Sequence, residues 1–332
     1  RDPYPRYKNF FNVHRVNVIS NESGADVAPE GIFRDTAFDA AYYFDGSTER
    51  QLYISDTKAN AALNLGLSDA GFTADIRMMT VNSSRHGGAS GTYAVYAGGN
   101  SSSTETALHE MGHLFNGLAD EYGGFTLPYG SSEPREINVT KDPSGAKWAH
   151  WKGYMQAGIG VIGAYEGAKY YDHGLYRPSQ NSKMRSLGQP FDAIAREKII
   201  LDIYAIVDPL DNHLSNVVPL VDPAELWVQA IDPRVIEVEW FVNGSKVPAA
   251  RGEHFRLLDH GFGEGVFSVN ARAFDPTGFD PDNGWVRRNQ DQLEQNVSWT
   301  VTQTVPEPAT IVLAAMAILF IIGVWLSKSL HY

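Results

Sequence analysis

The chain has 332 residues and 43% hydrophobic content, enough for one large domain or two ordinary ones, each with its own core. A formal net charge of -12 argues against a duplex nucleic-acid partner, because phosphate binding needs a basic surface. The chain contains no cysteine, which excludes disulfides, thiolate metal sites and a cysteine nucleophile. Any transition-metal site must therefore use His, Asp, Glu or Tyr.

The first hundred residues alternate strand-like and helical patterns, which is typical of a layered α/β or α+β domain. The expected elements are strands over 13–19, 74–81 and 92–97, helices over 35–44 and 56–67, and a glycine-rich loop over 83–91. The chain starts at Arg1 with neither an initiator Met nor an apolar signal segment. This indicates either a removed signal peptide or a fragment boundary.

Residues 102–117 are predicted to form a helix with an apolar stripe at helical spacing, and Ser102 with Glu105 fits a capping box at its start. Residues 123–190 are rich in Gly, Pro, Tyr and Trp and are expected to consist largely of loops. A further helix is predicted over residues 191–207.

The composition changes after Asp208 and Pro209. Residues 235–242 alternate apolar and acidic side chains, and Asn243-Gly244 follows as a hairpin signal. We interpret residues 215–302 as a small all-β sandwich of immunoglobulin style. The predicted fold class is therefore α+β, with domains at 1–208, 209–303 and 304–332.

The segment with the strongest chemical signal lies in the predicted helix over 102–117. His109 and His113 are four residues apart, so they project from one helical face and can each give an imidazole nitrogen to a zinc ion. Glu110 lies beside the first histidine, where it can act on a water molecule at the metal. This is the HExxH arrangement, and its alternative is a helix with two surface histidines.

A catalytic zinc ion needs a third protein ligand and one open position. Gly117 suits a sharp turn at the helix end, and two carboxylates follow it. Asp120 is the first candidate for the third ligand and Glu121 is the second. The alternative for either residue is a surface carboxylate or a partner in a salt bridge.

The segment from His109 to Tyr122, HEMGHLFNGLADEY, resembles the signature of the IgA-peptidase-like zinc metallopeptidases. Further stretches are similar to the family pattern and occur in the same order, so that the resemblance spans about residues 8–205. These stretches are VNVISNESGA at 16–25, NSSRHGGASG at 82–91, NVT at 138–140 with Lys147-Trp148, and YRPS at 176–179 with KMRSL at 183–187.

The resemblance implies a zincin fold with a mixed sheet and an active-site helix. It implies that His109 and His113 are ligands, that Glu110 is catalytic and that Asp120 is the third ligand. Met184 would lie in a turn beneath the metal, although a methionine of the ordinary core would fit the spacing equally well. Members often carry cysteines around that turn, whereas this chain has none, so any cysteine role is lost.

The end of the chain carries an independent signal. Residues 309–326 contain no charge over 18 residues, near the lower limit for a membrane-spanning helix. With Val305-Pro306-Glu307-Pro308 before it and Lys328 after it, the tail resembles the PEP-CTERM sorting signal of Gram-negative bacteria. That resemblance implies export, recognition by an exosortase and a cell-surface or extracellular location. An ordinary membrane anchor is the alternative.

These observations predict a secreted or cell-surface zinc metalloendopeptidase that acts on protein or peptide substrates, with Glu110 as general base. A donor for the developing oxyanion is expected among Tyr170, His173, Tyr176 and Arg177, with Tyr176 as our choice. The predicted strand over 92–97 is expected to pair with an extended substrate. The competing hypothesis is a surface-attached binding protein that uses the β-sandwich, with a zinc domain that is weakly active or structural.

Overall fold

The computed structural model describes residues 1–280 and 284–304. The chain forms two compact units, of which unit 1 comprises residues 1–209 together with 275–294. Of the described residues, unit 2 comprises 210–274 and 295–304. This division differs from the expected boundaries, because a segment from the predicted sandwich belongs to unit 1.

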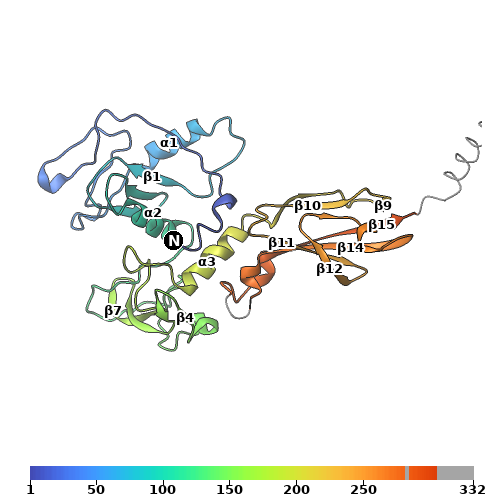
Figure 1. The fold of residues 1–332 in the computed structure, drawn as a ribbon. Coiled ribbons are helices and arrows are strands. Elements are labelled where there is room, and N and C mark those ends of the chain that lie inside the picture. The colour runs from blue at the N-terminus through green and yellow to red at the C-terminus, as the bar shows by residue number, and fades with distance from the viewer. Residues whose placement is uncertain (281–283, 305–332) are drawn as a thin grey trace, which may run out of the picture. The chain divides into compact units, whose positions relative to one another are not determined.

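Unit 1 contains a small mixed sheet that packs on a long helix. The strands β1 (Met78–Val81), β3 (Ala94–Ala97) and β2 (Gly88–Ser90) lie in the order β1-β3-β2, with β1 parallel and β2 antiparallel to the central β3. Helix α2 (Ser103–Leu114) packs against β3 and β2, and α1 (Asp56–Gly66) lies in the same part of the unit (Figure 1). The buried cluster there includes Tyr42, Leu52, Val81 and Val95.

The rest of unit 1 is built from short elements around α3 (Ala193–Tyr204). The short 3-10 helices η1 (Lys8–Phe10), η2 (Ala28–Glu30) and η3 (Ala146–Trp151) belong to unit 1. Its hairpins are β4 (Met155–Gln156) with β5 (Gly160–Val161), and β6 (Tyr165–Ala168) with β7 (Tyr171–Arg177). Trp148, Trp151 and Ile162 are fully buried against the start of α3.

Residues 275–294 pack within unit 1 and include η5 (Pro276–Gly278) and η6 (Gln290–Leu293). The buried carboxylate of Asp275 accepts hydrogen bonds from Tyr7 Oη at 2.5 Å and Tyr204 Oη at 3.0 Å, and Arg6 Nη2 lies 2.8 Å away. Glu197 on α3 accepts hydrogen bonds from the backbone N–H of Arg287 at 2.6 Å. Polar contacts at both ends therefore hold the segment in this unit.

Unit 2 is a two-sheet β structure. One sheet has the order β13-β10-β8 and the other has the order β12-β11-β14-β15-β9. Their bounds are β8 (Leu210–His213), β9 (Leu220–Val221), β10 (Leu226–Ala230), β11 (Glu237–Val242), β12 (Ser245–Arg251), β13 (His254–Phe255), β14 (Gly265–Phe274) and β15 (Glu294–Gln303), with η4 (Leu258–His260) between β13 and β14. Trp240 of β11 stacks on Phe255 of β13 at 5.0 Å between ring centroids, so the two sheets share one core.

Several predicted elements are confirmed. Helices form at 56–66, 103–114 and 193–204, close to the expected ranges. The Asn243-Gly244 turn joins β11 to β12, with both residues at positive φ. The capping box is wrong, because Ser102 makes no side-chain cap and Glu105 instead forms ion pairs with Arg1 and Lys183.

Two other element predictions are wrong. Residues 35–44 form no helix, because Ala41 bridges to both Asp26 and Tyr53, and Asp39 and Tyr43 adopt positive φ. Residues 13–19 form no strand, since no strand of the described chain pairs with them. Most of their side chains are exposed, and Val16 instead lies against Gly66 at the end of α1.

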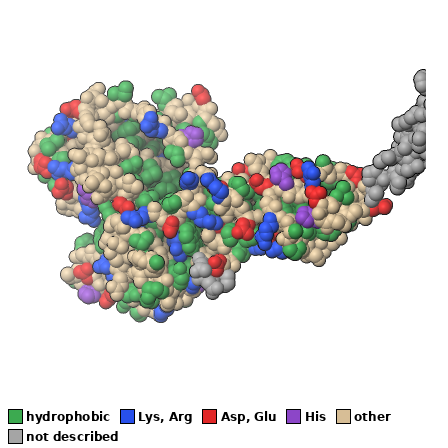
Figure 2. Space-filling view, viewed as in Figure 1, with side chains coloured by type: hydrophobic (Ala, Val, Ile, Leu, Met, Phe, Trp, Pro, Cys, Tyr) green, Lys and Arg blue, Asp and Glu red, His purple; other side chains and the backbone are tan. Residues whose placement is uncertain are grey.

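Basic and acidic side chains are intermixed over the face of unit 1 seen in Figure 2.

Within residues 1–280 and 284–304, every helix is too short or too polar to cross a bilayer. The predicted sorting signal and the predicted membrane-spanning helix over 309–326 lie outside the described residues.

Candidate metal centre

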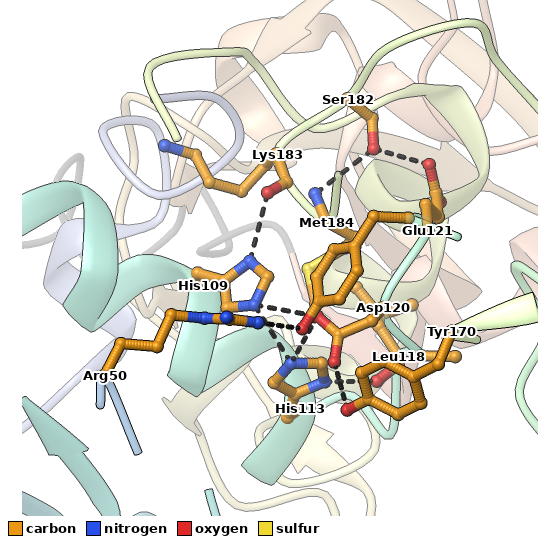
Figure 3. Close-up of polar contacts among 12 residues, drawn as sticks. Arg50, His109, His113, Leu118, Asp120, Glu121, Tyr170, Ser182, Lys183 and Met184 are labelled. Carbon is orange, nitrogen blue, oxygen red and sulfur yellow. Dashed lines mark hydrogen bonds and ion pairs between the residues drawn. The ribbon is translucent and has the colours of Figure 1, made fainter. Parts of the chain in front are cut away.

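Helix α2 places two imidazole rings side by side. The Nε2 atoms of His109 and His113 lie 3.1 Å apart. The Nδ1 atom of His109 is 3.1 Å from the carbonyl oxygen of Lys183, and that of His113 is 2.6 Å from the carbonyl oxygen of Leu118 (Figure 3). A carbonyl oxygen only accepts, so each Nδ1 carries the proton and each Nε2 presents a lone pair.

A tight turn after α2 returns the chain to these rings. Gly117 has φ of 59°, a conformation that favours glycine, and its N–H donates to the carbonyl oxygen of His113 at 3.0 Å. Leu118 N–H donates to the carbonyl oxygen of Gly112 at 3.1 Å. The turn thereby brings the Leu118 carbonyl to His113 and Asp120 to both histidines.

Asp120 completes a group of three ligand atoms. Its Oδ1 lies 3.1 Å from His109 Nε2 and 3.3 Å from His113 Nε2, and its side chain is 6% exposed. The three ligand atoms all lie within 4.8 Å of one another, and Asp120 Oδ1 is buried without a hydrogen-bond partner. Two imidazole lone pairs and a carboxylate oxygen repel one another unless a cation lies between them, so this donor set fits a metal ion.

The electrostatics of the group follow from burial and from Asp120. Without a metal ion, burial lowers the pKa of His113, but the neighbouring Asp120 carboxylate outweighs burial and raises the pKa to about 9, so a metal ion would displace a proton from His113 Nε2 on binding. Burial alone raises the pKa of Asp120, yet the contacts with the two rings hold the pKa of that carboxyl well below its usual range. Asp120 is therefore a carboxylate, the form that binds a metal ion.

Glu121, the second candidate for the third ligand, is turned away from the histidines. Its fully buried carboxylate accepts hydrogen bonds from Asn138 Nδ2 at 2.9 Å and Ser182 Oγ at 2.6 Å. Burial and the neighbouring Asp192 raise its pKa well above the ordinary value. Of the two carboxylates, the structure thus brings only Asp120 to the group.

Met184 lies in a loop that hydrogen bonds from Glu121 hold in place. Glu121 N–H donates to the carbonyl oxygen of Met184 at 2.8 Å, and Ser182 Oγ accepts from Met184 N–H at 3.2 Å. The fully buried Met184 packs under α2, where a Cβ added at Gly112 would lie 2.9 Å from its sulfur. The same loop supplies the Lys183 carbonyl that orients His109.

Glu110 lies between α2 and the edge strand β2. Its side chain is buried, and a Cβ added at Gly88 would lie 2.8 Å from Glu110 Oε1 and 2.6 Å from Thr106 Cγ2. Only glycine allows this close approach. Burial raises the pKa of Glu110, while the neighbouring histidines act in the opposite direction. A carboxyl group with a raised pKa beside a metal site is suited to accept and return a proton.

Three further side chains approach the group. Tyr170 Oη donates to Asp120 Oδ2 at 2.5 Å, and burial together with the charge of Asp120 raises the pKa of Tyr170. The Tyr122 ring lies 5.4 Å from that of Tyr170, and burial and Asp120 raise the pKa of Tyr122 to about 12. Arg50 Nη2 donates to Tyr122 Oη at 3.0 Å.

The group opens into a cavity of about 1090 Å³ that contains both polar and apolar walls. Its lining residues include His109, Glu110, His113, Asp120, Arg50 and Tyr170.

The model of the family described as IgA Peptidase M64 matches residues 1–160 and 155–203, more than half of the chain. The chain belongs to the IgA peptidase M64 family. A comparison with curated proteins finds no match.

The peptidase does not bring all of the expected donors to its candidate centre. Tyr176 lies in β7, where its backbone pairs with Thr140 and Glu166, and it does not line the cavity. Arg177 donates to the backbone oxygen of Gln180, and His173 lies on the surface beside Glu166. Of the four, only Tyr170 reaches the group.

The expected pairing strand also changes. The strand predicted over 92–97 is β3, which is central in the sheet of the peptidase, whereas β2 is the edge strand that lines the cavity. The backbone N–H of Gly88 is occupied by the carbonyl oxygen of Arg50 at 3.0 Å. In the antiparallel ladder with β3, Ser90 therefore turns its backbone groups toward the free edge.

Sequence reasoning missed Arg50 and Gly88 as residues of the site. Arg50 lies 59 residues before His109 in a segment with no recognisable motif, and only the fold brings it to α2. Gly88 was assigned to a loop, although the Gly87-Gly88 pair is a signal for close backbone approach.

Proposed function

We propose that the chain is a zinc metalloendopeptidase that hydrolyses peptide bonds in protein or peptide substrates. The observation that carries the proposal is the convergence of His109 Nε2, His113 Nε2 and Asp120 Oδ1 beside the buried Glu110. Imidazole and carboxylate ligands from a helix and the turn after it suit zinc, and three protein ligands leave a position for water. Bound there, zinc supplies Lewis acidity and makes water acidic enough to react at neutral pH.

The chain's own residues perform the remaining tasks. Glu110 accepts a proton from the attacking water and delivers it to the nitrogen of the leaving amine. Tyr170 fixes the orientation of Asp120 through the 2.5 Å hydrogen bond. The free edge of β2 offers backbone hydrogen bonds to an extended substrate, beside the acid–base residue. A purely structural metal site needs no base, and Glu110 therefore favours the enzyme over the binding protein.

Two variants test this proposal. Glu110→Gln should bind one equivalent of zinc by elemental analysis, yet lose hydrolysis of a peptide library by about 1000-fold or more, because the general base is gone. His113→Ala should lose zinc. Full activity in the glutamine variant would contradict the role of Glu110, and unchanged zinc content in His113→Ala would contradict the ligand assignment.

We further propose that the protein is exported and sorted to the cell surface of a Gram-negative bacterium. The support is the sequence of residues 305–308 followed by the apolar stretch 309–326, which would engage an exosortase and the membrane before any processing. Fractionation of cells that express the full chain, with and without residues 305–332, tests it. Equal distribution of the two forms would contradict sorting by this tail.

A further inference from the structure

Arg50 brings a fixed positive charge into the cavity of the candidate metal centre. It lines the same cavity as the two histidines, Glu110 and Asp120, and its guanidinium points toward the group in Figure 3. Its Cζ lies 5.5 Å from the centroid of the Tyr122 ring and Nη2 donates to Tyr122 Oη. Among the described residues, no carboxylate oxygen lies within 4.0 Å of its side-chain nitrogens.

The hydrogen-bond donors around the centre are unevenly available. The proton of Tyr170 Oη is directed at Asp120 Oδ2. A guanidinium has five N–H donors, and one of those of Arg50 is taken by Tyr122 Oη. Arg50 therefore has donors to spare for a substrate at this wall of the cavity.

The net charge of the centre also suits a role for Arg50 beside a developing negative charge. The carboxylates of Asp120 and Glu110 neutralise a divalent ion, so that Arg50 leaves the group with one net positive charge. A peptide carbonyl is neutral, but its oxygen becomes negative when water adds to the carbon. A fixed cation beside that oxygen stabilises the transition state more than the substrate, which raises kcat.

We propose that Arg50 is a catalytic residue that donates hydrogen bonds to the carbonyl oxygen of the scissile bond. This inference rests on the proposed peptidase function. As water adds to the carbonyl carbon, the π electron pair moves onto the oxygen that Arg50 contacts. The pair then returns, the C–N bond breaks, and the amine leaves with the proton that Glu110 carried. Arg50 itself neither gains nor loses a proton, because guanidinium remains charged throughout.

The role can be tested because the side chain of Arg50 is exposed, while its backbone carbonyl makes the contact with Gly88. Replacing the side chain should therefore leave the fold and the metal centre intact. Arg50→Ala should lower kcat by about 100- to 1000-fold with KM changed by less than about threefold, at unchanged zinc content. Added guanidinium chloride at millimolar concentration should restore part of kcat. The kcat of Arg50→Lys should fall between those of the wild type and Arg50→Ala, since lysine keeps the positive charge but lacks the planar set of guanidinium N–H donors.

Arg135→Gln, which removes an exposed arginine of unit 1 that does not line the cavity, is the matched control and should keep the kcat of the wild type. Equal losses in this variant and in Arg50→Ala would show a general charge effect and would overturn the proposal. A loss confined to KM, or the absence of any guanidinium rescue, would overturn it too, because each indicates ground-state binding or a structural role.

Binding measurements separate this inference from the proposed function. A phosphinic peptide, which carries a tetrahedral anionic group, should bind the zinc-loaded wild type about 100-fold more tightly than Arg50→Ala. Its uncharged ketomethylene counterpart should bind both equally. If the wild type holds zinc but hydrolyses no peptide, the proposed function fails, and the phosphinic peptide still decides the role of Arg50. Equal affinity of the two proteins for that peptide would overturn the inference.

Discussion

Tyr170 reaches the candidate metal centre from a sharply turned backbone. It follows Lys169 in the hairpin between β6 and β7, and both residues have positive φ, at 71° and 49°. A bulky residue rarely adopts this conformation, and it is found where the surrounding structure enforces it. Here the turn aims the phenol at Asp120 Oδ2, the oxygen that does not face the histidines. Tyr170 is thus a positioning residue for the ligand carboxylate.

We expect Tyr170→Phe to weaken zinc binding by about 10- to 100-fold, because the hydrogen bond that orients Asp120 is lost. Competition with a chromophoric chelator measures the change in affinity. Tyr176→Phe is the matched control and should bind zinc as the wild type does, since that residue does not line the cavity. If both variants bind zinc equally well, Tyr170 does not position the ligand.

At this scale the sequence predicts what local geometry determines. The spacing of His109 and His113 on a helix, and the turn at Gly117, are enough to place three ligand atoms together. Tyr176 does not line the cavity, because spacing along the chain cannot tell which residues of a hairpin face it. Arg50 lies on a segment that only tertiary packing brings to α2, so no local pattern reveals it.

Among the elements, the pairing of β2 with α2 depends on the missing side chain of Gly88. The strand passes so close to the helix that Glu110 and Thr106 fill the space of a Cβ. Helices with strong periodicity were predicted well, whereas residues 35–44 were not. There, bridges from Ala41 to two distant segments outweigh the helical pattern of the sequence.

Gly88→Ala should reduce hydrolysis by at least about tenfold and lower the stability of unit 1 by about 1–3 kcal/mol, because the new methyl group displaces the Glu110 carboxylate. Zinc content should stay at one equivalent, since a Cβ at Gly88 would meet Thr106 and Glu110 and none of the three ligands. Gly91→Ala provides a comparison, as a Cβ there meets nothing within 4 Å. A Gly88→Ala enzyme with normal activity and normal stability would show that β2 and α2 can move apart without loss of stability.

On the scale of the whole molecule, the chain returns to unit 1 after leaving it. Residues 275–294 follow β14 and reach the first residue of β15, yet they pack with α3, η3 and the N-terminal segment of unit 1. This return cannot be predicted from the sequence, because the composition changes only once, near residue 209. Long-range polar contacts such as those of Asp275 leave no periodic pattern.

The contact through Glu197 makes this arrangement sensitive to acid. Its carboxylate accepts hydrogen bonds from His150 Nε2 at 2.6 Å, Trp151 Nε1 at 2.9 Å and the backbone N–H of Arg287 at 2.6 Å. Burial alone raises the pKa of Glu197, but these donors outweigh it, so the pKa lies below the ordinary value of 4.5. A carboxyl group with a depressed pKa in the folded state stabilises the fold above the ordinary pKa, and this stabilisation disappears as the pH falls through the depressed value.

We therefore expect Glu197→Gln to be less stable than the wild type at pH 7, by about 3 kcal/mol, because the amide leaves some of the buried donors without an acceptor. The difference should shrink as the pH falls from about 4.5 through the depressed pKa of the folded state, where the wild-type carboxyl becomes protonated. Calorimetric unfolding of the full chain between pH 7 and pH 3 measures this difference in stability. The other carboxylates titrate in both proteins, so their contribution cancels when the two are compared. Glu264→Gln, at an exposed position of unit 2, should match the wild type throughout. If the destabilisation by Glu197→Gln is the same at every pH, the charge of Glu197 does not hold residues 275–294 in place, and packing against Trp151 must do so instead.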